Sequence, residues 1–174
     1  MRIESTAFTE ADYYAFLGGY LERERPELVA RLRRIPDDVD ELVPRLEEAA
    51  PSSVDDPAWN AGETLAHMAT SAAFFGWAIH EISQGKDIGG QMLEFMNLRD
   101  PAIVESVRQP PAALAQQLRI ALERLAAFVE TVPYDDLRTS IAFANRELSA
   151  EDFTRFSVVH HLEDHTEQMR RALS

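Results

Sequence analysis

Residues 60–83 read NAGETLAHMATSAAFFGWAIHEIS, and this stretch has the features of one long, buried helix. Asn60 is a residue that caps helix starts, and Glu63 follows three positions later, as in a capping box. Between residues 64 and 79 there is no Asp, Glu, Lys or Arg. A helix so free of charge is expected to be covered on most sides. We therefore predict one helix here, ending near Gly85.

Three further segments have the apolar spacing of long helices. Pro36 is expected to end the first of them, because proline lacks the N–H that a helix interior needs. The helices are predicted over residues 9–34, 61–83, 111–131 and 149–173. Four long helices, one of them nearly free of charge, predict an all-α fold. We expect a single domain over residues 1–174, built as a four-helix bundle with two long connections.

The segments between these helices are expected to be mostly irregular. A short amphipathic piece at residues 37–50 should kink or restart at Pro44. Residues 85–101 form a long connection with room for a short helical turn, and residues 132–148 form another. The second connection is predicted to contain an extended segment around residues 140–144.

Composition excludes several classes of protein. The net charge is −13, from 30 acidic and 17 basic residues, which disfavours binding to nucleic acid and to anionic membranes. The chain has no cysteine, so disulfides, cysteine metal sites and thiol nucleophiles of its own are excluded. The first residues have no apolar run typical of a secretory signal. We therefore expect a cytoplasmic protein.

Three of the five histidines lie in the stretch VVHHLEDH near the C-terminus. With a turn of about 100° per residue, His161 and His165 lie on the apolar side of the last predicted helix. His160 lies roughly opposite, beside acidic residues, and is expected to be solvated. Two imidazoles four residues apart on one helix face can reach a single ion. Alternatively, each could bond a backbone carbonyl or a carboxylate.

His67 lies in the charge-free stretch of the second helix. A lone buried histidine is commonly a satisfied core residue. Three inward histidines from two helices, however, bring six ring nitrogens that need partners, and one metal ion satisfies three of them. The residues therefore favour a metal site. His80, in HEISQ, lacks the second histidine of a zincin motif, and no histidine follows a Glu-x-x pattern typical of di-iron bundles.

Two motifs resemble those of the DinB/YfiT-like superfamily of metalloenzymes. PAWNAGETLAHMATSAAFF (57–75) resembles the first, and FTRFSVVHHLEDHTEQMRRAL (153–173) resembles the last. The resemblance extends from about Leu28 onward, and the first 25 or so residues look like an extra or lengthened helix. It implies a four-helix bundle with long crossovers and a site of three histidines holding nickel, zinc or iron.

Residue by residue, the resemblance implies that His67, His161 and His165 are the metal ligands and that Trp59 has a packing role. Members of the family include transferases and isomerases that use mycothiol, bacillithiol or glutathione, among them maleylpyruvate isomerases. The resemblance therefore implies a thiol-dependent transferase or isomerase that acts on small electrophiles. We expect a homodimer, because such bundles often dimerise.

Other residues and other functions stay open. Glu63 could orient His67 or act as a base, although an acid at a helix start is favoured by the helix dipole alone. Tyr134, Asn145 and Arg146 precede the last helix, and Arg146 could bind a substrate carboxylate or lie on the surface. The alternatives to a thiol transferase are a metal-dependent hydrolase, a non-catalytic metal-binding or stress-related bundle, and a plain helical bundle.

Overall fold

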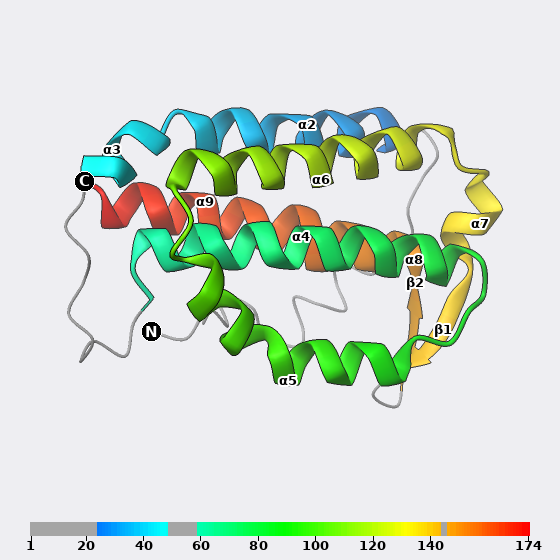
Figure 1. The fold of residues 1–174 in the computed structure, drawn as a ribbon. Coiled ribbons are helices and arrows are strands. Elements are labelled where there is room, and N and C mark those ends of the chain that lie inside the picture. Colours follow the sequence, from blue (N-terminus) through cyan, green and yellow to red (C-terminus); the bar gives the residue numbers. More distant parts are fainter. Residues whose placement is uncertain (1–23, 49–58, 144–145) are drawn as a thin grey trace.

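Four helical segments form the centre of the protein (Figure 1). The computed structural model describes residues 24–48, 59–143 and 146–174. Contacts join α2 to α6, α6 to α4, α4 to α9, and α9 back to α2, which closes a four-helix bundle. The all-α prediction is therefore confirmed. The bundle helices are α2 (Arg25–Asp40), α4 (Ala61–Ser83), α6 (Pro111–Thr131) and α9 (His161–Ala172).

The bundle contains two pairs of neighbouring helices that run parallel to each other. Figure 1 shows α4 and α6 both running from left to right, whereas α2 and α9 both run from right to left. Parallel neighbours require a long connection, because the chain must return along the bundle before it starts the second helix. The core between the four helices is apolar, and Leu32, Leu65, Leu118 and Leu162 have no exposed surface.

The beginning and end of α4 are as the sequence predicts. The Asn60 side chain accepts a hydrogen bond from the Glu63 N–H at 2.8 Å, and the Glu63 carboxylate accepts one from the Asn60 N–H at 2.9 Å. Gly85 follows the helix with a φ of 71°, a left-handed conformation that favours glycine. This cap fixes where α4 starts and therefore which turn carries His67.

The prediction that Pro36 ends the first helix is wrong, because α2 continues through Pro36 to Asp40. Ile35 and Val39, on either side of the proline, are completely buried. Tertiary packing of these side chains therefore outweighs the local cost of proline. Residues 9–23 of the predicted helix lie outside the described part of the chain. A short helix, α3 (Val43–Glu48), begins beside Pro44, as the expected restart requires.

The first long connection is more helical than predicted. It contains α5 (Gly89–Ser106), an 18-residue helix that packs along α4 outside the bundle. Phe95 of α5 stacks on Phe74 of α4 with ring centroids 4.0 Å apart. Met92 and Ile103 of α5 are buried as well. These apolar contacts hold α5 against α4. They explain why this segment is helical although its apolar pattern is too weak to predict a helix.

The second connection contains a short helix and a hairpin. Helix α7 (Tyr134–Arg138) precedes β1 (Ser140–Phe143), which confirms the extended segment, and β2 (Arg146–Ser149) pairs with it antiparallel. Ser149 then caps the last helical segment by accepting the Asp152 N–H at 3.0 Å. No helix among the described residues is long and apolar enough to cross a membrane.

The sequence predicts one continuous helix over residues 149–173, but this segment is divided into α- and π-helical parts. A single α-helical turn, α8 (Ala150–Phe153), leads into a π-helix, η2 (Thr154–His160), and α9 begins immediately afterwards at His161. π-Helical turns are rare and often occur at functional sites, because they change which residues face inward. Here the change from π to α geometry occurs at one of the candidate ligands.

Candidate metal centre

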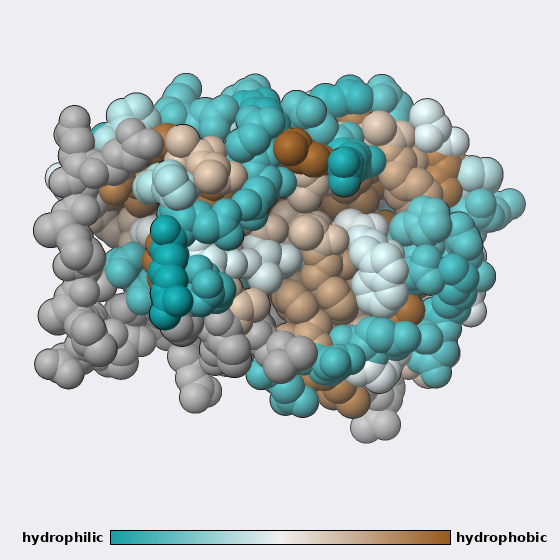
Figure 2. Space-filling model, in the orientation of Figure 1, coloured by the Kyte–Doolittle hydropathy of each residue, from teal (hydrophilic) through white to brown (hydrophobic). Residues whose placement is uncertain are grey.

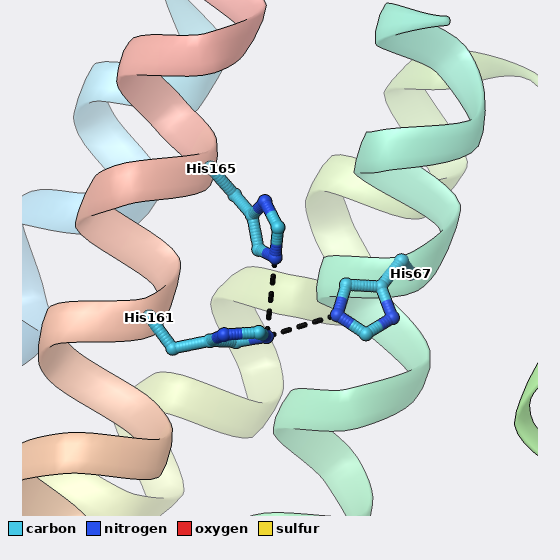
Figure 3. Close-up of side chains that lie close together, drawn as sticks. All are labelled: His67, His161 and His165. Carbon is cyan, nitrogen blue, oxygen red and sulfur yellow. Dashed lines mark hydrogen bonds between the residues drawn. The ribbon is translucent and has the colours of Figure 1, made fainter. Parts of the chain in front are cut away.

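Three histidines from two helices meet inside the bundle. His67 comes from the second turn of α4, and His161 and His165 come from the first turns of α9. Figure 3 shows the three rings directed toward one another. Nε2 of His161 lies 2.9 Å from Nε2 of His67 and 3.2 Å from Nε2 of His165. The candidate ligand atoms all lie within 4.8 Å of one another.

Two neighbouring side chains hold the outer nitrogens of this cluster. Nδ1 of His165 lies 3.0 Å from Oε1 of Gln168, one turn further along α9. An amide oxygen only accepts, so this Nδ1 carries the hydrogen and Nε2 keeps a lone pair. Nδ1 of His67 lies 3.2 Å from Oγ of Ser71, which can accept its hydrogen in the same way. Both Nε2 lone pairs then face His161.

With these tautomers, the centre of the cluster has more lone pairs than hydrogens. Nε2 of His161 carries at most one hydrogen in the neutral ring, yet it faces the Nε2 atoms of both His67 and His165. A single hydrogen cannot point at both acceptors with good geometry. A cation among the three nitrogens would satisfy all of them. The chemistry of the donor set therefore fits a metal ion.

Two of the three nitrogen–nitrogen spacings also fit a metal ion, and the third pair, within 4.8 Å, would have to draw closer around it. With metal–nitrogen distances of about 2.1 Å, ligand nitrogens lie about 3.0 Å apart at right angles and about 3.4 Å apart in a tetrahedron. The two nitrogen–nitrogen distances at His161, 2.9 and 3.2 Å, are close to these values. Imidazole suits zinc, iron and nickel, so the donor type does not select among them. The group can thus hold a divalent ion.

Burial differs among the three ligand candidates. His67 and His165 are 2% and 1% exposed, whereas His161 is half-buried. The Trp59 ring lies against His67, with centroids 4.8 Å apart, and the Phe75 ring lies 6.3 Å from that of His161. The packing role predicted for Trp59 agrees with its partly buried position against the core. Aromatic rings therefore adjoin the nitrogen cluster.

A different set of contacts holds the outer side of α9. Glu163, between the two histidines of that helix, accepts hydrogen bonds from Arg31 at 2.9 and 2.5 Å and from Arg34 at 3.1 Å. The hydrogen bond to Glu163 raises the pKa of the Arg31 guanidinium above its usual value. Further along, Arg170 pairs with Asp38 at 3.0 Å. These ion pairs join α9 to α2.

The remaining two histidines lie outside the cluster. His160 is half-buried and belongs to the π-helix, so it is less solvated than the sequence suggests. His80 is exposed near the end of α4, where Nδ1 lies 3.2 Å from the Glu81 carboxylate and Nε2 lies 3.2 Å from the Gln84 amide. His80 therefore lies apart from the three clustered histidines and contacts side chains at the end of its own helix.

The other residues singled out in the sequence lie in different places. The Glu63 carboxylate is part of the α4 cap, one turn before His67. Arg146 begins β2, and Asn145 lies outside the described residues. Tyr134 begins α7, which lies where α4 ends, whereas His67 lies near its start (Figure 1). Tyr134 is therefore not beside the histidines, and roles for Glu63 and Arg146 stay predictions.

Ser71 and Gln168 are site residues that sequence reasoning missed. Each lies one turn from a histidine on the same helix, at a spacing of four and three residues, where side chains meet. This spacing is the sequence feature that could have identified Ser71 and Gln168 as site residues. It is weak, because many polar residues have it by chance.

Comparison with known proteins identifies the family. The family model of the DinB superfamily matches residues 20–169. No curated protein and no solved structure matches the chain. The matched region includes all three clustered histidines, the helices α2, α4 and α6, and most of α9. Because it covers most of the 174 residues, the chain belongs to the DinB superfamily.

Proposed function

We propose that the protein is a divalent-metal-dependent enzyme in which His67, His161 and His165 hold the ion. One observation supports this most directly: three imidazole nitrogens from α4 and α9 converge, with 2.9 and 3.2 Å between neighbours. Three protein ligands are the usual number at a catalytic zinc site, whereas structural sites generally use four. The half-buried position of His161 favours access to the ion from outside.

We further propose that the reaction transfers a low-molecular-weight thiol, such as mycothiol, bacillithiol or glutathione, to a small electrophile, or uses it to isomerise one. The chain has no cysteine, so the sulfur nucleophile has to come from a co-substrate. A divalent ion in the site would favour the deprotonated form of a thiol or water bound beside it. The thiolate forms a carbon–sulfur bond while the leaving group departs with its electron pair, and the thiol proton passes to solvent.

Residues around the three histidines would have two roles in this reaction. Ser71 and Gln168 would keep the rings of His67 and His165 oriented, because each contacts the outer ring nitrogen. Trp59 and Phe75 would form an apolar wall beside the nitrogens and limit water there. Glu63 is engaged in the α4 cap, so we do not assign it the proton transfer.

The first test is metal content. The protein, purified without a histidine tag, should contain about one divalent ion per chain by mass spectrometry, as one three-histidine site implies. His67→Ala and His165→Ala should lose the ion, whereas His80→Ala, which changes an exposed histidine outside the cluster, should retain it. Absence of metal from the wild type, even after incubation with nickel, zinc and iron, would rule out the proposed ligands.

The second test separates catalysis from a structural role for the metal. The metal-loaded protein would be mixed with 1-chloro-2,4-dinitrobenzene and each of the three thiols in turn. Thioether formation that depends on both metal and thiol supports the transferase. A site that binds metal, gives no turnover with any thiol and unfolds when a chelator is added would instead indicate a structural metal.

A further inference from the structure

A second concave region lies between α4 and α6. It is a groove of about 570 Å³, within the volume range typical of small-molecule sites. Figure 2 shows apolar side chains in tan and brown across the middle of this face, where Figure 1 shows α4 beneath α6. Its lining includes Ala73, Gly76, Trp77, Ile120 and Arg124.

Small residues of α4 give this groove its depth. Ala73 and Gly76 line it, and a Cβ added at Gly76 would meet nothing within 4 Å. Glycine in a helix interior weakens the helix relative to alanine. Here no close contact of the described residues demands glycine, so packing within this chain does not explain it. The open space at Gly76 is part of the groove.

The rim of the groove offers both apolar surface and a positive charge. Trp77 of α4 and Ile120 of α6 are each 40% exposed. Arg124, one turn after Ile120, forms no ion pair with any residue of the described ranges. The protein carries a net charge of −13, so an unpaired guanidinium beside an exposed indole is a local attraction for an anion.

This groove is separate from the histidine cluster. At about 100° per residue, Ser71 lies about 40° around α4 from His67, whereas Gly76 lies about 180° from it. His67 and Ser71 are fully buried on the inner side, and Ala73 and Trp77 are exposed. A molecule in the groove would therefore lie across α4 from the metal ligands and could not contact them.

We propose that this groove binds a small amphipathic anion: an apolar or aromatic body that lies on Gly76 and against Trp77, with a carboxylate or sulfonate that pairs with Arg124. The small residues admit the body, the indole provides a flat apolar contact, and the guanidinium fixes the anionic end. The site is independent of the proposed metal chemistry, because none of its residues belongs to the cluster.

Two probes that differ only in charge test this site. 8-Anilinonaphthalene-1-sulfonate has an aromatic body and a sulfonate, and N-phenyl-1-naphthylamine is the same body without the charge. Fluorescence titration of the wild type should show one saturable site per chain for the sulfonate. Arg124→Ala should weaken sulfonate binding about tenfold, as loss of one charge-assisted contact implies, and leave the neutral probe unchanged. Arg171→Ala, an exposed arginine of α9 outside the groove, should change neither.

Filling the groove gives a second, independent test. Gly76→Leu should abolish binding of both probes, and Gly76→Ala should weaken it, while thermal unfolding shows that both variants are at least as stable as the wild type. Several results would overturn the proposal: no saturable site in the wild type, undiminished binding in Gly76→Leu, or an equal effect of Arg124→Ala on both probes. Analytical ultracentrifugation would give one more result that could overturn the proposal. If the wild type is a dimer and Gly76→Leu is a monomer, the groove is a subunit interface instead.

Discussion

The two sides of α9 are held in place by different chemistry. Toward α4, His161 and His165 present imidazole nitrogens to His67, where His67 and His165 are buried and His161 is half-buried. Toward α2, Glu163 and Arg170 form ion pairs whose side chains are 23–61% exposed. Both sets of contacts join α9 to a neighbouring helix over the same few turns. They should nevertheless respond very differently to substitution.

The difference follows from the surroundings of each group. A buried polar atom that loses its partner carries the full cost of desolvation, whereas an exposed ion that loses its partner is solvated by water. The inner side should therefore depend strongly on every member and on the metal. The outer side should tolerate loss of single members with small, salt-dependent changes in stability.

The largest expected effect is on the inner side, from loss of a direct ligand candidate. Removing a residue that merely supports a ligand typically lowers metal affinity 10–100-fold, so His67→Ala or His165→Ala should lower it by more than about 100-fold. Competition titration against a chelating dye would measure the affinity. Equal affinities in wild type and both variants would mean that the ion binds elsewhere.

A smaller effect on the same side is expected from the residue that orients His165. Gln168→Ala removes the acceptor at 3.0 Å from Nδ1 and should lower metal affinity by about 10-fold or more. Gln117→Ala provides the matched control, because this glutamine lies on α6 with its amide bonded to Gln109. A change in thermal stability with no change in metal affinity would show that Gln168 only packs.

On the outer side of α9, Glu163→Gln should have a smaller effect, and the quantity affected is the free energy of unfolding. It removes the charge that pairs with Arg31 and Arg34, so we expect the free energy of unfolding to fall by about 1 kcal/mol. The loss should shrink in about 1 M salt, where the ion pairs of the wild type are screened as well. Urea titration at low and high salt would measure both. Metal affinity should stay unchanged, and a large decrease would link the two sides of α9.

The smallest effect is predicted for the exposed end of the outer side. Arg170→Gln removes the pair with Asp38, at 3.0 Å, and a longer pair with Glu167 on the same helix, at 3.6 Å. The free energy of unfolding should change by less than about 0.5 kcal/mol. The same urea titration would detect a larger loss. A loss equal to that of Glu163→Gln would mean that exposure does not set the strength of these pairs.

Features that depend on local spacing were predictable from the sequence. Asn60 and Glu63 form the expected cap, and the helix over 111–131 matches the predicted bounds. The 100° rotation also placed His161 and His165 inward correctly, because both lie in the regular part of α9. Convergence of His67 on them followed from burial of α4, a property that a charge-free sequence displays directly.

Features that depend on tertiary contacts were not predictable. Helix α5 has two glycines at its start and a weak apolar pattern. Its Phe95 nevertheless stacks on Phe74 of α4, and this contact stabilises the helix. Pro36 reads as a helix end, yet buried Ile35 and Val39 keep α2 continuous. Ser71 and Gln168 become recognisable only once the ring nitrogens have positions. In each case the deciding partner lies far away in the sequence.

The π-helix before His161 has a consequence for recognising such sites in other chains. A wide turn accommodates an additional residue in a helix, so the number of residues between the Ser149 cap and His161 could change by one while the ends stay in place. The four-residue step from His161 to His165 lies in regular α geometry and has no such freedom. A search pattern should therefore fix the downstream interval and allow a one-residue gap upstream.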